Sequence, residues 1–505
     1  MLIVMVVYLA LMVCIGAYYS KGNSSAGDFY LGGRKLGPFV SAMSAEASDM
    51  SSWLLMGLPG LAYLSGVAEP FWTALGLGIG TYINWLIVAK RLRRYSEKAN
   101  NSITIPDFFK NRYRDNSNVL LCISAAIIVV FFVPYTASGF AACGKLFSTL
   151  FDADYTVAMI FSAIVIVLYT ALGGFLAAST TDLIQSIVMS IALIVVLVFG
   201  IQTAGGIGSV VENAQSLTGY LSLTSSYDIT TDSSTPYSLL TIISTLAWGL
   251  GYFGMPHILL RFMAAKNEKQ IKLSRRIATI WVFIAMFAAI AIGVIGLGMT
   301  NVGAIEQLTT SGDSEKIIIK IAQLLSENGV LAIILGGVIL SGILACTMST
   351  ADSQLLAASS SVSQNILKDT FKVKAVDKHP MLFARVTVIA IAAVAVFIAR
   401  DPDSSVFNIV SFAWAGFGAA FGPVMLFSLF WKRTNKYGAI AGMVTGGVMV
   451  FVWKYLIAPL GGVWAIYELL PAFVISCIVI VVVSLCTKAP SDEIVKEFEE
   501  VKAGK

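Results

Sequence analysis

The segment from Ser48 to Gly60 combines groups that bind ions with residues that interrupt helices. It reads Ser-Asp-Met-Ser-Ser-Trp-Leu-Leu-Met-Gly-Leu-Pro-Gly and lies inside an apolar run long enough to cross a bilayer. A charged side chain at membrane depth, here Asp49, costs about 3 kcal/mol on insertion scales and usually faces a cavity where it has a function. Glycine and proline predict a broken helix whose freed carbonyl oxygens can bind a ligand. The segment therefore indicates an ion-coupled transporter.

The acids in apolar runs each leave a structural alternative open. Asp49 either takes part in ion or solute coupling or caps the N-terminus of a half-helix through backbone N–H groups. Glu46, one turn earlier, either faces the same cavity or lies near the cytoplasmic end of its helix. Asp182 follows Ser-Thr-Thr and is either a first-turn acid of a helix or part of an ion pathway.

The run from Cys346 to Ser353 offers hydroxyl and carboxylate oxygens over two helical turns, with Ser349, Thr350 and Asp352 inside it. Hard cations prefer oxygen ligands, and two hydroxyls would suit sodium if a neighbouring broken helix added carbonyl oxygens. The alternative is that each hydroxyl bonds back to a carbonyl one turn earlier, which is common in membrane helices. Beside a broken helix, we favour sodium coordination.

Four aromatic residues lie at or beside irregular segments: Trp53, Tyr135, Trp248 and Tyr252. They either line a solute cavity or pack in the interior, and the residues alone do not decide between the two. The other tryptophans that we considered fit the interfacial belt or plain packing typical of membrane proteins: Trp72, Trp85, Trp431 and Trp464.

Membrane helices must position these side chains. Of the 505 residues, 57% are hydrophobic and 12% are charged, and the mean hydropathy is +0.81. Runs of about 20 apolar residues predict an all-α polytopic membrane protein, whereas a β-barrel would show short alternating segments. We expect thirteen transmembrane helices, roughly 1–20, 38–64, 68–90, 117–147, 155–173, 181–203, 236–262, 275–300, 328–364, 382–400, 405–431, 437–458 and 463–486.

The basic residues are concentrated in alternate loops, among them the stretch 261–276. With the N-terminus outside, only 5 of the 34 Lys and Arg residues lie toward the exterior: Lys145, Lys316, Lys320, Arg400 and Lys454. Because cytoplasmic loops carry the excess of positive charge, we expect an outside N-terminus and a cytoplasmic C-terminus in the cell membrane. The long exterior loops, 204–235 and 301–327, are then polar.

A second interrupted segment resembles the first. It reads Trp-Gly-Leu-Gly-Tyr-Phe-Gly-Met-Pro-His from Trp248 to His257, and five spans separate the starts of the two interrupted spans. An odd offset inverts the second unit, and paired broken helices in inverted repeats indicate a binding site near the bilayer midplane. We expect a first span and loop at 1–37, repeats at 38–203 and 236–431, an extracellular loop at 204–235, two peripheral spans at 432–487 and a cytoplasmic tail at 488–505.

Enzymatic and nucleic-acid functions find no support in the sequence. There is no Walker A motif, so ATP-driven transport by this chain alone is not indicated. The six cysteines form no CxxC pair, and no His/Cys cluster has the spacing of metal ligands. The net charge of +5 is modest and does not imply nucleic acid.

At these motifs the chain resembles the sodium:solute symporter family, most closely its bacterial proline carriers. The resemblance covers nearly the whole length. Its most specific parts are Leu31-Gly32-Gly33-Arg34, Ser48 to Gly60, Trp248 to Gly254, Pro256-His257-Ile258-Leu259, and Ser349-Thr350 followed by Ser353-Gln354-Leu355-Leu356. It implies a 5+5 inverted-repeat core with broken first helices, as in neurotransmitter:sodium symporters.

The resemblance also implies roles for individual residues. The main sodium site would use the carbonyls of Ala47, Met50 and Cys346 and the hydroxyls of Ser349 and Thr350. Asp49 matches the acid that couples sodium to solute. A second sodium site would use Asp182, Asp352 and Ser353. Proline-cavity positions would be Ser51, Trp53, Gly57, Tyr135, Trp248, Tyr252 and Pro256.

We therefore expect sodium-coupled uptake of L-proline by alternating access, with sodium as the coupling ion and the lipid bilayer as the surroundings. No obligate protein partner is evident. Glu46 and Asp352 depart from the usual family pattern, so the number of coupled ions and the involvement of protons stay open. Ser52 also departs from it, which leaves the fit of the cavity to proline open. The alternatives are symport of another amino acid, pantothenate or a sugar, and a solute sensor that does not transport.

Overall fold

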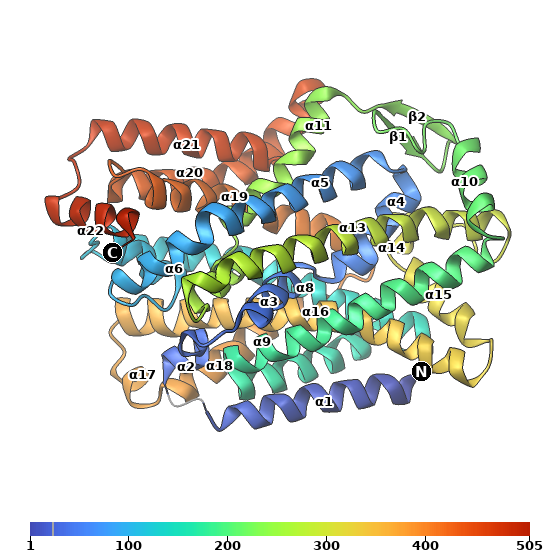
Figure 1. The fold of residues 1–505 in the computed structure, drawn as a ribbon, viewed down its shortest axis with the longest axis horizontal. Coiled ribbons are helices and arrows are strands. Elements are labelled where there is room, and N and C mark those ends of the chain that lie inside the picture. The colour runs from blue at the N-terminus through green and yellow to red at the C-terminus, as the bar shows by residue number, and fades with distance from the viewer. Residues whose placement is uncertain (23–24, 505) are drawn as a thin grey trace.

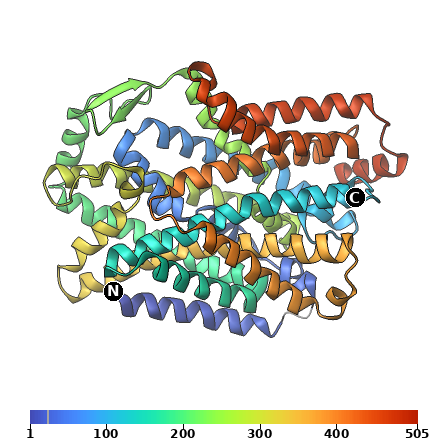
Figure 2. The ribbon, with the colours of Figure 1, turned by 180° about the vertical axis from the view of Figure 1, so that it is seen from behind.

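The computed structural model describes residues 1–22 and 25–504, which are mostly helical. The long helices run along the longest axis of the molecule (Figure 1), with α1 along one side of the bundle and α20 and α21 along the other. The same arrangement is seen from behind in Figure 2. The two termini lie at opposite ends of the bundle.

The helices and strands have these bounds: α1 Leu2–Ser20, α2 Ala26–Leu31, α3 Pro38–Asp49, α4 Leu58–Ser65, α5 Ala68–Ile83, α6 Ala89–Lys98, α7 Ile105–Arg112, α8 Val119–Phe151, α9 Tyr155–Thr203, α10 Ile207–Ser216, β1 Ser225–Asp228, β2 Ser233–Pro236, α11 Leu239–Leu246, α12 Pro256–Ala264, α13 Ile271–Asn301, α14 Ser311–Ser314, α15 Ile317–Ser326, α16 Val330–Ser360, α17 Lys374–Lys378, α18 Pro380–Ile398, α19 Val406–Phe430, α20 Lys436–Val452, α21 Leu469–Cys486 and α22 Asp492–Ala503. Short π-helical segments continue α5, α16 and α20, and β1 and β2 pair antiparallel.

Ten helices in the described part of the chain are long and apolar enough to cross a membrane, or eleven if the bent pair Leu239–Phe253 and Pro256–Ala264 is one span. Two features keep this number below the predicted thirteen. The expected spans 155–173 and 181–203 form the single 49-residue helix α9, in which Gly174 is non-helical (φ 65°, ψ −161°). The expected span 38–64 is divided into shorter helices.

The predicted break in the second span is confirmed, but proline does not cause it. Helix α3 ends at Asp49, Met50 leaves the helical region with ψ 71°, and the chain resumes as a π-helix at Trp53–Gly57. Pro59 lies in the first turn of α4, where its missing N–H is not needed. The break therefore lies next to Asp49, several residues before the Gly-Pro-Gly cluster.

The other interrupted span has the predicted irregular backbone. Helix α11 passes into a 3₁₀-helix at Ala247–Phe253, and α12 begins at Pro256 with a bend of 45°. A 3₁₀ stretch inside a helical span is typical of a functional or strained position. Both interruptions thus bring backbone out of the regular hydrogen-bonding ladder inside the bundle.

The predicted exterior loops contain structure that composition did not reveal. The segment 204–235 holds α10 and most of the β1–β2 hairpin, at the end of the bundle that carries the N-terminus. The segment 301–327 was expected to be a polar loop, but its part α15 is apolar and buries Ile317, Ile318 and Ile319. That expectation was wrong because the serines and threonines of the loop precede α15 and mask its apolar run.

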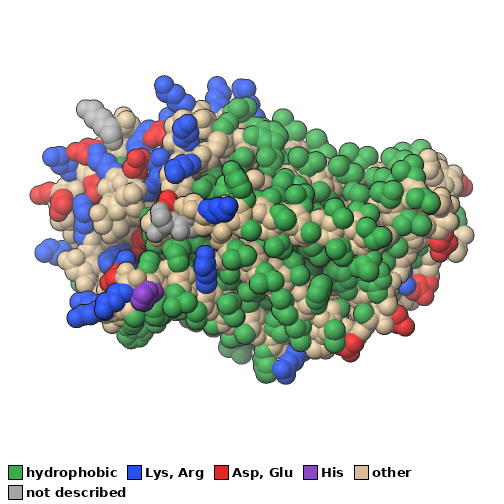
Figure 3. All heavy atoms as spheres, turned by 90° about the horizontal axis from the view of Figure 1, so that it is seen from below, with side chains coloured by type: hydrophobic (Ala, Val, Ile, Leu, Met, Phe, Trp, Pro, Cys, Tyr) green, Lys and Arg blue, Asp and Glu red, His purple; other side chains and the backbone are tan. Residues whose placement is uncertain are grey.

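The composition of the surface changes along the molecule (Figure 3). Hydrophobic side chains cover its middle, and Lys and Arg gather at the end that carries the C-terminus. Exposed apolar side chains of this kind, such as Ile3, Val157 and Phe397, are 78%, 66% and 62% exposed. An apolar belt of this extent requires lipid around it.

Close glycine contacts hold α5 against the 3₁₀ segment. A Cβ on Gly249 would lie 2.3 Å from the carbonyl oxygen of Gly76, and one on Gly80 would lie 2.4 Å from the carbonyl oxygen of Gly249. We expect Gly249→Ala to destabilise the protein by about 1–3 kcal/mol, because backbone must move to admit the methyl group. Thermal unfolding in detergent measures this.

Gly208→Ala is the matched control for that substitution. Gly208 lies in α10, and a Cβ there meets nothing within 4 Å. The melting temperature of the Gly208→Ala variant should equal or exceed that of the unsubstituted protein, since alanine is a better helix former than glycine. Equal melting temperatures for the two variants would contradict the close packing of α5 on the 3₁₀ segment.

Candidate functional site

The end of α3 meets α16 through groups that were predicted to bind sodium. The hydroxyl of Ser349 lies 2.7 Å from the carbonyl oxygen of Ala47 and 3.2 Å from that of Cys346. The hydroxyl of Thr350 lies 3.2 Å from the same Cys346 oxygen. Four of the five predicted ligands therefore form one cluster, and the fifth, Met50, is buried at the adjoining break.

Asp49 joins the two interrupted spans. Its Oδ2 accepts a hydrogen bond from the hydroxyl of Tyr252, and its carbonyl oxygen accepts one from the indole N–H of Trp53 at 3.2 Å. No backbone N–H of the described residues donates to the Asp49 carboxylate, so the capping alternative is wrong. Asp49 is the last residue of α3, and its side chain lies at the negative end of the helix dipole. An anionic group there favours a nearby cation, and Oδ1 has no hydrogen-bond partner among the described residues.

Glu46 points toward α5 and the π-helical segment that follows it. Its carboxylate accepts hydrogen bonds from the hydroxyl of Thr81 at 3.1 Å and from the indole N–H of Trp85 at 2.9 Å. Trp85 is only 1% exposed, so of the two predicted roles, interfacial belt or packing, it has the packed one. The pairing explains how a second acid is tolerated one turn from Asp49.

An aromatic cluster stands next to Asp49. The rings of Trp53 and Trp248 are 6.3 Å apart, and the ring of Tyr252 meets that of Trp414 edge-on at 5.1 Å. Trp248 also stacks on Tyr467 at 5.1 Å, and its carbonyl accepts the Trp414 indole N–H at 2.8 Å. Three predicted cavity residues thus share one buried cluster.

Sequence reasoning missed three members of this cluster: Phe407, Trp414 and Tyr467. Phe407 lies 5.5 Å from Trp248, and a Cβ on Gly57 would lie 3.2 Å from its own Cβ, so Phe407 covers Gly57 directly. The signal that could have found Trp414 is its place among small residues, in Ala-Trp-Ala-Gly, within an otherwise bulky span. Tyr467 lies outside the predicted repeats and gave no such signal.

The remaining predicted cavity residues lie at the edges of the cluster. Tyr135 in α8 stands near Asp49 and Ser51, although its hydroxyl has no well-formed hydrogen bond within the described part of the chain. The backbone N–H of Trp53 donates to Ser51 at 3.4 Å. Pro256 opens α12, so it marks the positive end of that half-helix and contributes no side-chain hydrogen bond of its own.

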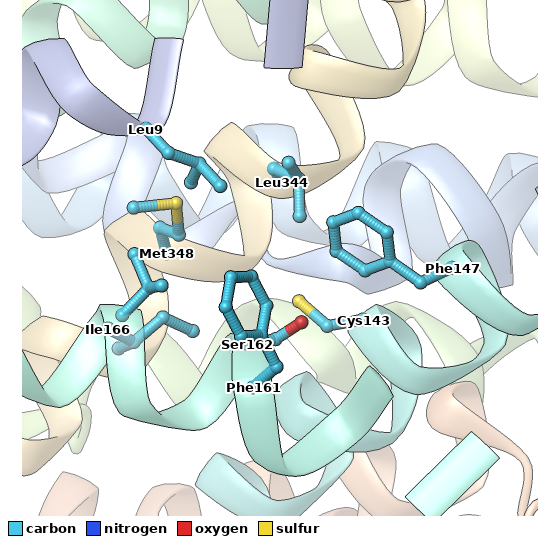
Figure 4. Close-up of a pocket in the computed structure, with 9 residues that line it drawn as sticks. Leu9, Cys143, Phe147, Phe161, Ser162, Ile166, Leu344 and Met348 are labelled. Atoms are coloured by element: carbon cyan, nitrogen blue, oxygen red, sulfur yellow. The ribbon is translucent and has the colours of Figure 1, made fainter. Parts of the chain in front are cut away.

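A cavity with a volume of about 150 Å³ adjoins the cluster at Gly57 and Phe407. Its other lining residues include Glu69, Ser314 and Glu315. A separate, apolar cavity between α1, α8, α9 and α16 has a volume of only about 10 Å³ (Figure 4). That space holds at most one water molecule and offers it few polar partners, so it is not a solute site.

The residues predicted for a second sodium ion also come together, but around an arginine. Arg261 forms a buried ion pair with Asp182 at 3.1 Å and donates to the hydroxyl of Ser353 at 2.5 Å. Ser353 lies 2.9 Å from Asp352, whose other oxygen accepts the Tyr169 hydroxyl at 2.9 Å. Arg261 was counted among loop cations, yet it is 1% exposed. Its position inside the predicted span 236–262 was the available signal.

Sequence comparison decides the family. The model of the sodium:solute symporter family matches residues 29–446. The sodium/proline symporter of Haemophilus influenzae is 42% identical over 506 residues, covering 99% of this chain and 97% of the relative. The chain belongs to the sodium:solute symporter family. The family resemblance inferred from the sequence is confirmed, and the chain is a multi-pass membrane transporter, not an enzyme.

Other relatives and solved structures agree with membership in the sodium:solute symporter family. The sodium/proline symporter of Escherichia coli is 42% identical and covers 100% of this chain and 96% of the relative. The osmoregulated proline transporter OpuE of Bacillus subtilis is 40% identical over 96% of this chain and 94% of its own length. A sodium-coupled sialic acid symporter in a substrate-bound outward-open state has a TM-score of 0.78 at 17% identity, covering 97% of this chain and 98% of that one.

A nucleobase-cation-symport-1 family transporter in a closed conformation has a TM-score of 0.55 at 13% identity, covering 94% of this chain and 99% of that one. At these low identities the two solved structures establish only the fold. That fold is shared by sodium-coupled and other cation-coupled symporters.

Proposed function

We propose that this protein is a sodium-coupled symporter that carries L-proline across the cell membrane by alternating access. The observation that carries the proposal is the cluster of Ala47, Cys346, Ser349 and Thr350 oxygens beside Asp49 and the aromatic cluster. Relatives of about 40% identity over nearly the whole chain, named as proline transporters, support the choice of solute.

Sodium would replace hydrogen bonds that the cluster makes now. The Ser349 hydroxyl donates its hydrogen bond to a carbonyl oxygen, that of Ala47 or that of Cys346. A cation between these oxygens would draw the hydroxyl oxygen toward itself and turn the proton outward. The ion would then tie α3 to α16 more strongly than one neutral hydrogen bond does.

The aromatic cluster suits proline for two reasons. Its ring faces offer apolar area for the pyrrolidine ring and a cation–π contact for the secondary ammonium group. The helix that resumes after Ser52 and the helix that begins at Pro256 both present their positive ends, which suit a carboxylate. Asp49 would stand between the ion and the solute and couple the two sites.

The architecture that we propose for this function has thirteen spans. Counting α9 as two spans and each interrupted segment as one gives that number. Spans two to six, 38–203, and seven to eleven, 236–431, would form the inverted repeats. Outside the repeats, the chain would form a first span and loop at 1–37, an extracellular loop at 204–235, two peripheral spans at 432–487 and a cytoplasmic tail at 488–505. The basic end of the molecule would face the cytoplasm, with the N-terminus outside.

Uptake of radiolabelled proline into proteoliposomes under an imposed sodium gradient tests the proposal. We expect accumulation above equilibrium that collapses when the gradient is removed. Uptake that is absent, or that is independent of the gradient, would refute it. Competition by other amino acids, pantothenate and sugars at the same site tests the alternative solutes, and binding without flux would favour a sensor.

Replacing Ser349 with alanine tests the sodium cluster. We expect the sodium concentration for half-maximal uptake to rise by about tenfold, which corresponds to the loss of roughly 1.4 kcal/mol of ion binding. The measurement is proline uptake over a series of sodium concentrations at constant ionic strength.

Ser341→Ala is the control for Ser349→Ala because it removes a hydroxyl of the same helix. Within the described part of the chain, the Ser341 hydroxyl donates only to the carbonyl oxygen of Gly337, one turn earlier, at 2.8 Å. The sodium concentration for half-maximal uptake by the Ser341→Ala variant should stay within about twofold of that of the unsubstituted protein. An unchanged sodium requirement in Ser349→Ala would remove Ser349 from the site.

A further inference from the structure

A polar cavity lies at the basic end of the molecule, the end that carries α22 and the C-terminus (Figure 1). Three segments form its wall: the turn after α7, the first turn of α20 and the linker from α21 to α22. Its volume is about 350 Å³, which is sufficient for a small ligand. The cavity is separate from the candidate sodium cluster and from the aromatic cluster.

Every charged side chain among the residues that line the cavity is a cation: Arg114, Lys436 and Lys488. Arg114 forms ion pairs with Glu497 at 2.6 Å and with Glu493 at 3.3 Å. Lys436 and Lys488 form no ion pair with any residue that the structure describes. Because like charges in one cavity repel each other, the cavity favours a negatively charged occupant.

The acid next to Arg114 in the chain, Asp115, does not supply this negative charge. It attracts Lys436, but it is buried outside the lining of the cavity. Its carboxylate accepts hydrogen bonds from the backbone N–H groups of Leu120 at 2.9 Å and Ser117 at 3.1 Å. Asp115 therefore stabilises the start of α8 and leaves the cavity with an excess of positive charge.

Hydrogen bonds hold the wall of the cavity in place. The side chain of Asn435 is buried, and its Oδ1 accepts the backbone N–H of Gly438 at 2.9 Å, which caps α20. Its Nδ2 donates to the carbonyl of Lys488 at 2.8 Å. Lys436 and Lys488 are thereby fixed on neighbouring parts of one wall. The hydroxyl of Ser491 makes no capping bond to α22, so it is a further donor at the cavity.

The position of the cavity points to a lipid. Tyr437 and Val444 on α20, and Val482 and Leu485 on α21, are exposed on the helices that lead away from it. Exposed apolar faces of this kind contact acyl chains, and the cations at their end stand at the level of the lipid headgroups. A free phosphate ion would gain nothing from these apolar faces.

We propose that this cavity binds the phosphate group of an anionic phospholipid, with Lys436, Lys488 and Arg114 as its cationic contacts. The acyl chains lie along α20 and α21. The bound phosphate joins the linker before α22 to α20 and to the turn after α7, and so holds α22 in place. Basic pockets at the ends of membrane helices are suited to such headgroups. The inference goes beyond the proposed transport of proline and does not depend on it.

Binding of phosphatidylglycerol to the purified full-length chain in a neutral detergent tests the proposal. Native mass spectrometry measures the affinity, and thermal unfolding measures the stabilisation that a ligand of the folded chain must give. We expect phosphatidylglycerol to bind more tightly than phosphatidylcholine, which has no net charge. Lys436→Gln combined with Lys488→Gln should weaken binding of phosphatidylglycerol by about tenfold or more.

Lys374→Gln combined with Lys378→Gln is the matched control. Both lysines are exposed on α17, at the same end of the molecule but outside the cavity, and the double substitution removes the same charge (Figure 1). Binding of phosphatidylglycerol should stay within about twofold of that of the unsubstituted chain. Inorganic phosphate, added as a competitor, should displace little of the lipid.

Each other result overturns the inference. Equal losses in the two double variants would mean that the lipid responds only to the overall charge of this end. Equal binding of phosphatidylglycerol and phosphatidylcholine would exclude a site for an anionic headgroup, and efficient displacement by inorganic phosphate would assign the cavity to free phosphate. If the double variant of the cavity does not fold, Lys488→Gln alone decides: weaker binding supports the lipid site and unchanged binding refutes it. None of these results bears on sodium-driven uptake, so the proposed function stands or falls separately.

Discussion

Asp49→Asn is expected to lower sodium-driven proline uptake by roughly 100-fold or more while the protein remains folded. The carboxylate lies at the negative end of α3 and accepts the Tyr252 hydroxyl from the other interrupted span. A carboxylate and a cation about 4 Å apart attract each other by about 4 kcal/mol in partly buried surroundings, and asparagine loses that attraction. Proteoliposome uptake measures the loss, and size-exclusion chromatography in detergent checks the fold.

Two variants at the contact between Asp49 and Tyr252 show whether the missing charge causes the loss of uptake. Asp49→Glu keeps the charge and should retain more uptake than Asp49→Asn. Tyr252→Phe keeps the ring that meets Trp414 but removes the hydroxyl donor, so its loss should be near tenfold, or about 1.4 kcal/mol. If Asp49→Asn transports with unchanged sodium dependence, Asp49 does not couple the ion to the solute.

The sequence was sufficient for the fold class and for most of the candidate sodium cluster. Apolar runs give membrane helices because each backbone polar group must be satisfied within the bilayer. The Gly-Pro-Gly cluster predicted a broken span, and the span is broken, although α3 already ends at Asp49 and Pro59 lies in the first turn of α4. Ser349 and Thr350 were recognisable because adjacent hydroxyls in an apolar helix have few other uses than back-bonding or coordination.

The partners of these residues could not be predicted, because they come from distant spans. Glu46 is compensated by Thr81 and Trp85 on α5 and its continuation, and nothing in the spacing of these residues indicates that contact. Arg261 was interpreted as the first cation of a loop, because the end of a helix can be predicted only to within several residues. A shift of a few residues in that end decides whether the guanidinium is buried in the bundle or exposed in the loop. Contacts of this kind depend on how whole helices pack.

The ion pair of Lys145 and Glu315 joins two segments that the sequence analysis kept apart, the end of the predicted span 117–147 and the predicted loop 301–327. Lys145 was counted as an exterior cation, yet both side chains are 2% exposed and their charged atoms are 3.0 Å apart. Glu315 also accepts hydrogen bonds from the Ser405 hydroxyl and from the backbone N–H groups of Val406 and Phe407, at 3.0–3.2 Å. It therefore holds the first turn of α19, from which Phe407 covers Gly57.

Glu315→Gln should destabilise the protein by about 3–5 kcal/mol, because it leaves the Lys145 ammonium buried without a counter-charge. An amide oxygen can still accept from the α19 backbone, so the loss reports mainly on the missing charge. We expect a fall of several degrees in the melting temperature measured in detergent, together with slower uptake, since the first turn of α19 then holds Phe407 less firmly over the aromatic cluster.

Two controls separate this ion pair from surface electrostatics. Glu306 pairs with Lys320 at 2.7 Å but is 69% exposed, so Glu306→Gln should leave the melting temperature nearly unchanged. Lys145→Met combined with Glu315→Gln removes both charges and should recover much of the stability that Glu315→Gln loses, because no buried charge is left unpaired. A double variant less stable than Glu315→Gln alone would mean that Lys145 stabilises α19 through its bond to the Ser404 carbonyl, at 2.6 Å, and not through the ion pair.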